Sequence, residues 1–234
     1  MAGNGKGKSI ARRIVRGVVL LVVVVGLVAG YLWWRWSSVP AYWEDNRAFL
    51  ESTDGAQLSR MAEVVEKRVP MDVSRIEVAD TETVRLTFED MNAWLAQRMN
   101  GWLNYRGWQL PPEVTQPMVA AEGDLLVFAV KYVGEGMDQV LSIVMDIGVE
   151  EDGRCRLRFV RARGGKLSLP AGKILDQLDL GSYSDQIVYE SGSEPSLLFE
   201  PVFAIDPNRN TRLVDVEVDA EAVSLIVRNE RKQR

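Results

Sequence analysis

Apolar residues fill the chain from Gly17 to Trp34, an 18-residue run that holds no charge. As a helix rising about 1.5 Å per residue, the run would cover roughly 27 Å, close to the ~30 Å hydrocarbon core of a bilayer. Three arginines precede it and Arg35 closes it. The pattern predicts a transmembrane helix over residues 17–36. The residues expected to contact lipid are Gly17, Val18, Leu20, Leu21, Val25, Leu27, Leu32, Trp33 and Trp34.

A cleaved signal peptide is the alternative interpretation of this run. Residues 28–30 are small and follow an apolar stretch, as a cleavage site requires. Aromatic residues come immediately afterwards: Tyr31, Trp33, Trp34 and Trp36. Such residues form belts at membrane–water interfaces, so they favour an uncleaved anchor.

Helical spacing continues after the span. A short helix is expected over 42–51, and a second over 58–69 has apolar residues every three or four positions. Pro70 is expected to end the second helix. We therefore predict a basic tail over 1–16, the transmembrane helix over 17–36, a helical linker region over 37–82 and one domain over 83–230.

The pattern changes within this domain. Residues 83–88 alternate as a short strand, and Thr87 with Asp90 resembles a capping box for a helix with a broad apolar stripe. From Met118 the period becomes two, which predicts strands over 118–121, 125–133, 139–150 and 154–163. The alternation slips by one residue at Phe159-Val160, where we expect a β-bulge.

The last third of the domain mixes one helix with three strands. A helix is expected over 171–178, a polar loop over 182–194, and strands over 197–205, 211–218 and 222–228. Runs of strands with helices in front predict the α+β class. The expected architecture is an N-terminal transmembrane helix followed by one extracytoplasmic domain with a curved antiparallel sheet and a few packed helices.

Charge is divided unevenly along the 234 residues. Residues 1–36 hold six of the 28 basic residues and no acid, which leaves 22 basic and 33 acidic residues, a net charge of −11, for the remainder. A basic segment before the span places the N-terminus in the cytoplasm, so the C-terminal domain would be periplasmic or extracellular on a bacterial inner (cytoplasmic) membrane. The acidic domain argues against nucleic acid as a partner.

Catalytic side chains are scarce. There is no histidine, which removes Ser-His and Cys-His systems and imidazole metal binding, and there is one cysteine, Cys155. Cys155 alternates with Leu157 and Phe159, so we expect a buried, inert thiol. No P-loop, Gly-x-Gly-x-x-Gly motif or zinc-spaced cysteine pair is present. We expect a non-enzymatic protein without catalytic residues, metal or cofactor.

Two clusters are candidate binding residues. Arg154, Arg156 and Arg158 alternate on one strand face, either as an anion or lipid-headgroup contact or as a solvated face paired with acids such as Asp215, Glu217 and Asp219; we favour the second interpretation. Aromatic residues at helical spacing, Trp94, Trp102 and Trp108, could line an apolar groove, rest on the membrane or fill the core, and core packing is favoured. Asn92 is expected to satisfy backbone groups of a neighbouring segment.

Two motifs carry a family resemblance. They are Leu86-Thr87-x-x-x-Met91-Asn92-x-Trp94-Leu95 and Gly165-x-Leu167-x-Leu169-Pro170-x-x-x-Ile174-Leu175. In this order behind an anchor, over residues 83–180, the chain resembles the YpmS-like membrane-anchored bacterial proteins of unknown function. The resemblance implies an extracytoplasmic α+β domain with a hydrophobic groove between curved sheet and helix. It implies no catalytic residues.

Two functions remain open from the sequence. The preferred one is a membrane-anchored binding domain whose partners are the bilayer, through its helix, and a lipid, another apolar ligand or an envelope protein. The alternative is a structural or assembly subunit of an envelope complex, in which Gly26 and Gly30 let a second helix approach the span. A hydrolase using two carboxylates is a third hypothesis, for which no acid pair stands out.

Overall fold

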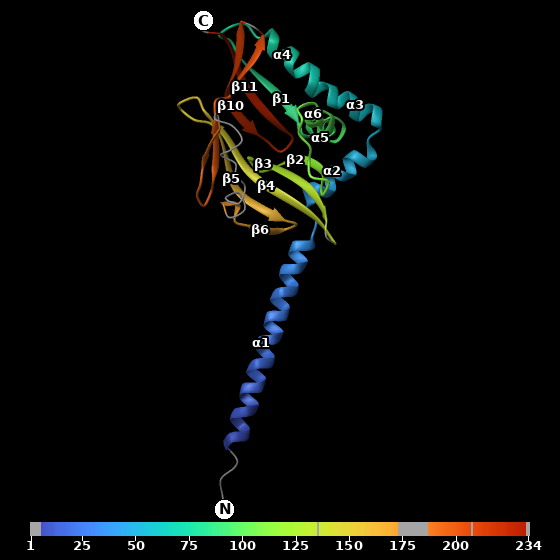
Figure 1. Cartoon of the computed structure of the whole chain (residues 1–234), viewed down its shortest axis with the longest axis vertical. Coiled ribbons are helices and arrows are strands. Elements are labelled where there is room, and N and C mark those ends of the chain that lie inside the picture. The colour runs from blue at the N-terminus through green and yellow to red at the C-terminus, as the bar shows by residue number, and fades with distance from the viewer. Residues whose placement is uncertain (1–5, 135, 173–186, 207, 233–234) are drawn as a thin grey trace, which may run out of the picture.

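The computed structural model describes residues 6–134, 136–172, 187–206 and 208–232 (Figure 1). The predicted helix over 171–178 and the start of the predicted loop over 182–194 fall mainly on 173–186, outside the described residues.

The first element is the helix α1, Lys6–Ser37, which extends away from the rest of the molecule (Figure 1). A helix near the N-terminus is long and apolar enough to cross a membrane: an 18-residue window has a mean hydropathy of 1.5, and none of it is buried. By length and composition, this helix suits a membrane anchor or a signal sequence.

A helical region follows. Its elements are α2 (Ala41–Ser52), α3 (Gly55–Glu63), the π-helical turn η1 (Val64–Arg68) and α4 (Val69–Arg75). The region contributes buried side chains to the domain, among them Trp43, Leu58 and Ile76. The expectation that Pro70 ends a helix was wrong, because α4 continues past it. The π turn directly before Pro70 widens the helix where a proline would otherwise clash with the preceding turn.

The first sheet is antiparallel, with strand order β1-β11-β10-β9. Its strands are β1 (Thr81–Thr87), β9 (Val202–Asp206), β10 (Arg209–Val218) and β11 (Ala222–Arg231). β1 leads into α5 (Phe88–Gln97) and α6 (Met99–Tyr105). The Asp90 N–H donates to Thr87 Oγ1 at 3.1 Å, which confirms Thr87 as the N-cap of α5.

The second sheet is also antiparallel, with order β2-β3-β4-β5-β8-β7 and with β6 paired to β5. Its strands are β2 (Val114–Glu122), β3 (Leu125–Gly134), β4 (Met137–Val149), β5 (Cys155–Gly164), β6 (Leu167–Leu169), β7 (Ile187–Glu190) and β8 (Ser196–Phe199). The α+β class with antiparallel strands and packed helices is confirmed, and the strands divide between two sheets.

A core lies where the two sheets and α4 meet. Cys155 of β5 is buried there with Val216 of β10, Val223 of β11 and Ile76 at the end of α4. The β-bulge expected at Phe159-Val160 is confirmed, because the register between β4 and β5 shifts by one residue there. The bulge changes which side chains of β5 share a face, and Phe159 packs in a second cluster with Met145 and Ala171.

Candidate functional site

A pocket of about 300 Å³ lies between α2, α5 and β2. Its lining combines apolar and polar side chains, including Trp43, Asn46, Leu50, Leu95, Ala96, Gln116 and Pro117. We call it the α2 groove. Its volume is at the lower end of the roughly 300–1,000 Å³ typical of small-molecule sites.

An irregularity of β2 forms one wall of the groove. The register of β2 against β3 shifts between Thr115 and Met118, so Gln116 and Pro117 form a bulge. Gln116 has φ +49°, a left-handed conformation that is unfavourable for a residue with a Cβ. Pro117 has no N–H to donate to the ladder, which suits a bulge. Both residues line the α2 groove, and strained backbone of this kind is concentrated at ligand sites.

Asn92 attaches α5 to the edge of β2. Its Nδ2 donates to the carbonyl of Val119 at 2.8 Å, and its Oδ1 accepts from the N–H of Val119 at 2.7 Å. β2 is the edge strand, so these bonds replace those that a further strand would make. The side chain of Asn92 is buried, and its predicted role of satisfying a neighbouring backbone is confirmed.

The opposite wall is α2. Trp43 is buried against Met118, Ala129 and Val140 of the second sheet, which gives the groove an apolar floor. At the exposed rim, Arg47 and Glu51 form an ion pair of 3.6 Å. A second hollow of about 320 Å³ shares Asn46 with the groove. An apolar floor with a polar rim suits an apolar or amphipathic ligand.

The predicted aromatic residues lie outside this groove. Trp94 and Trp102 contact each other edge to face, with ring centroids 6.3 Å apart, and Trp94 Nε1 donates to Glu66 Oε1 at 3.2 Å. Trp102 and Trp108 are 43% and 64% exposed, so the interpretation of this cluster as core packing was wrong for them. The Arg106 guanidinium lies 5.5 Å from the Trp102 ring centroid. Met99 is the buried residue of the short helix α6, whereas Trp102 on α6 and Trp108 after it are exposed to solvent.

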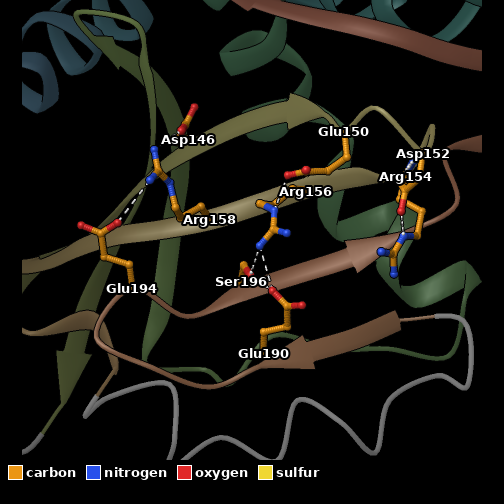
Figure 2. Close-up of polar contacts among 9 residues, drawn as sticks. All are labelled: Asp146, Glu150, Asp152, Arg154, Arg156, Arg158, Glu190, Glu194 and Ser196. Atoms are coloured by element: carbon orange, nitrogen blue, oxygen red, sulfur yellow. Dashed lines mark hydrogen bonds and ion pairs between the residues drawn. The ribbon is translucent and has the colours of Figure 1, made fainter.

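The arginine row of β5 is paired with acids throughout (Figure 2). Arg154 contacts Asp152 at 2.7 Å, and Arg156 contacts Glu150, Glu190 at 2.8 Å and Ser196 at 3.1 Å. Arg158 contacts Asp146, and Glu194 at 3.4 Å. The row therefore forms a ladder of ion pairs across β4, the β4–β5 turn, β5, β7 and the β7–β8 turn, with one hydrogen bond to Ser196 of β8.

The acids of this ladder differ from those expected. Asp215, Glu217 and Asp219 belong to β10 and the turn after it, on the first sheet, and Asp219 contacts Arg85 at 2.7 Å. Alternation along a strand shows which residues share a face but not which strand lies beside it. The hydrogen bond from Arg156 to Glu150 raises the pKa of Arg156, and the hydrogen bond from Ser196, with that from Arg156, lowers the pKa of Glu190.

A tighter cluster continues the row. Glu122 at the end of β2 accepts from Arg161 at 2.6 Å and from Arg163 Nη2 at 2.8 Å. The hydrogen bond from Arg163 is the largest cause that lowers the pKa of Glu122. Two arginines of β5 thus bind the carboxylate of Glu122 at the end of β2. Since β3 and β4 lie between these strands in the sheet, the contacts connect β2 to β5 across both of them.

Cys155 is 2% exposed and has a raised pKa because burial disfavours the thiolate. The expectation of a buried thiol is confirmed. Within the part of the chain that the structure describes, no three His, Cys, Asp or Glu side chains are arranged to hold a metal ion.

Comparison of the chain with protein-family models, with curated proteins and with solved structures gave no match. Sequence reasoning missed the α2 groove because Pro111, Pro112 and Pro117 precede the regular alternation and the strand was predicted to begin only at Met118. In the structure, β2 begins at Val114 and bulges at 116–117.

Proposed function

We propose that this protein is a single-pass, membrane-anchored, non-enzymatic domain that holds an apolar or amphipathic ligand in the α2 groove. The groove is the observation that carries the proposal: an apolar floor at Trp43, a strained bulge at Gln116 and a polar rim surround about 300 Å³ of space. The titratable residues of its lining, Arg47 and Glu51, pair with each other at the rim, so the groove offers binding surface in place of an acid–base pair.

The position of the groove supports a membrane setting. α2 begins at Ala41, and α1 ends at Ser37, so the first turn of α2 follows the candidate span directly. The basic segment before the span and the net charge of −11 after residue 36 support a cytoplasmic N-terminus and an extracytoplasmic domain. In this arrangement, the groove lies close to a source of acyl chains.

A protein partner is the second candidate function. It is favoured by the aromatic surface at α6 and its turn, where Trp102, Tyr105 (87% exposed) and Trp108 lie together in sequence. Exposed aromatic residues are enriched in the centres of protein interfaces. This candidate corresponds to the assembly subunit expected as the alternative from the sequence.

Photocrosslinking tests the first candidate. The full chain is reconstituted in nanodiscs that contain a phospholipid with a photoreactive acyl chain, and adducts are mapped by peptide mass spectrometry. Adducts on α1 report the anchor. Adducts on α2 or α5 report the groove.

Two matched variants locate the signal. Ala96→Trp places a ring in the groove, whereas Ala56→Trp places the same ring on an exposed position of α3 outside it. We expect adducts on α2 and α5 in the unmodified chain and in Ala56→Trp, and at least a tenfold loss in Ala96→Trp. Adducts restricted to α1 in all three proteins, or unchanged by Ala96→Trp, would contradict lipid binding in the groove.

A further inference from the structure

The end of α1 is attached to the second sheet by several contacts. The Lys166 N–H donates to the carbonyl of Arg35 at 2.9 Å, and Arg35 Nη2 donates to the carbonyl of Lys166 at 2.6 Å. Gln139 of β4, which is buried, donates through Nε2 to the carbonyl of Trp36. These bonds join α1 to β4 and to the β5–β6 turn, more than 100 residues away in sequence.

Two glycines complete this attachment. A Cβ at Gly164 would overlap the ring of Trp36, so the ring occupies the space that a side chain would need. Gly165 has φ +56°, and a Cβ there would overlap the carbonyl oxygen of Trp36. Only glycine permits so close an approach at both positions. We call Arg35, Trp36, Gln139, Gly164, Gly165 and Lys166 the anchor joint.

The anchor joint fixes the position of the β3–β4 hairpin along the axis of α1. Gln139 is paired with Tyr132, and Val133 is the next residue toward the tip, about 3.3 Å further along the strand. Figure 1 shows the end of this hairpin at the level where α1 meets the domain. Val133 is 46% exposed although it is apolar, and the side chain of Lys166 is also exposed on the neighbouring turn.

We infer that the tip of the β3–β4 hairpin, at Val133, and the β5–β6 turn, at Lys166, rest on the phospholipid headgroup layer. The inference depends on the proposed membrane span of α1, with which this surface is continuous. If Trp33 and Trp34 lie at the interface, the headgroup region extends roughly 5–7 Å beyond the hydrocarbon. Arg35 and Trp36 follow within this layer, and the anchor joint brings the hairpin and the turn to the same level.

The chemistry of the two contacts suits that layer. Val133 offers an apolar side chain at a hairpin tip, and Lys166 offers an ammonium group at the level of lipid phosphates. No acid among the described residues pairs with Lys166, whereas Lys131 on β3 is paired with Asp138 at 3.0 Å. The protein would therefore contact the bilayer at three places: α1, which crosses it, and Val133 and Lys166, which rest on its surface.

Quenching by lipid measures this contact. A thiol-reactive fluorophore is attached to Val133→Cys or to Val78→Cys in the full chain, since Cys155 is buried and remains unlabelled. Val78 is the matched control: it is 39% exposed, is bridged to Asn229, and follows three residues after the end of α4 at Arg75. Figure 1 shows α4 at the end of the domain away from α1. Nanodiscs carry a nitroxide on the lipid headgroup.

We expect at least threefold stronger quenching at Val133→Cys than at Val78→Cys. Trp36→Ala removes the ring that packs on Gly164 and should reduce the quenching at Val133→Cys toward the level at Val78→Cys. Gly164→Leu, which places a side chain where the ring lies, should have the same effect. Equal, weak quenching at both labels would overturn the contact, and strong quenching unchanged by Trp36→Ala and Gly164→Leu would overturn the role of the anchor joint.

The readout separates this inference from the proposed function. A chain that fails to float with vesicles lacks the anchor, and both proposals are then overturned. A chain that floats, shows quenching at Val133→Cys and gives no adducts on α2 or α5 keeps the membrane contact and loses the ligand groove.

Discussion

Replacement of Asn92 by alanine should destabilise the domain by about 2–4 kcal/mol. The amide of Asn92 makes two bonds to Val119, at 2.8 and 2.7 Å, and its side chain is 4% exposed. Removing it leaves one N–H and one carbonyl of the edge strand without partners, and each such group costs about 1–3 kcal/mol when buried. The two groups together would cost about 2–6 kcal/mol. Because water partly reaches the edge of the sheet, we expect a loss in the lower half of this range, about 2–4 kcal/mol.

Urea unfolding of the full chain in detergent, followed by tryptophan fluorescence, measures this free energy. Asn104→Ala is the control, because Asn104 is exposed on α6 and should change stability by less than about 0.5 kcal/mol. Asn92→Asp keeps the shape and the acceptor but sets a carboxylate oxygen against the Val119 carbonyl, so it should be destabilised at neutral pH and recover as acid restores a donor. If Asn92→Ala unfolds within 0.5 kcal/mol of the unmodified chain, the edge-strand argument fails.

Two further predictions concern charge and burial. The hydrogen bond from Arg163 lowers the pKa of Glu122, so this pair stabilises the fold above the unfolded pKa of about 4.3, and the contribution is lost as pH falls through the folded pKa. Glu122→Gln should therefore lower the free energy of unfolding by about 1–2 kcal/mol at pH 7, a value already reduced for the solvent screening of a carboxylate that is 36% exposed, and by much less near pH 3. Equal losses at both pH values would contradict a stabilising role of the ionised pair. Cys155 is buried with a raised pKa, so an aromatic disulfide reagent should leave it unmodified in the native chain and modify it fully in denaturant, whereas fast native labelling would show that β5 is open.

Local features of the fold could be predicted because neighbouring residues determine them. Thr87 caps α5 through a contact three residues away, and the extra residue at Phe159-Val160 is visible as a slip in alternation. Asn92 was expected to bond a neighbouring segment, although the partner, Val119, is 27 residues distant and could not be named.

Long-range arrangement could not be predicted in the same way. A period of two shows that Arg156 and Asp215 lie on strands, but their strands belong to different sheets, and Arg156 pairs with Glu150 and Glu190. The bulge at Gln116 was hidden because the adjacent proline suggested a loop, and a single proline is compatible with either structure.

Residues 35–52 contribute to both the anchor joint and the α2 wall of the groove, which would link the proposed membrane attachment to the proposed ligand binding. Gln139 donates to the carbonyl of Trp36. Pro40 is then the N-cap of α2, and the Trp43 N–H donates to the Pro40 carbonyl at 3.1 Å. The N-terminal end of the α2 wall is thereby fixed to the sheet within a few residues of the span. The opposite wall, formed by β2, is fixed independently because Asn92 of α5 bonds to Val119 at its edge.

If the groove binds the proposed ligand, its two fixed walls would not need to be ordered first, which would lower the entropic cost of binding. If α1 spans the membrane as proposed, the close packing of Trp36 on Gly164 and Gly165 would also set the orientation of the groove toward the bilayer.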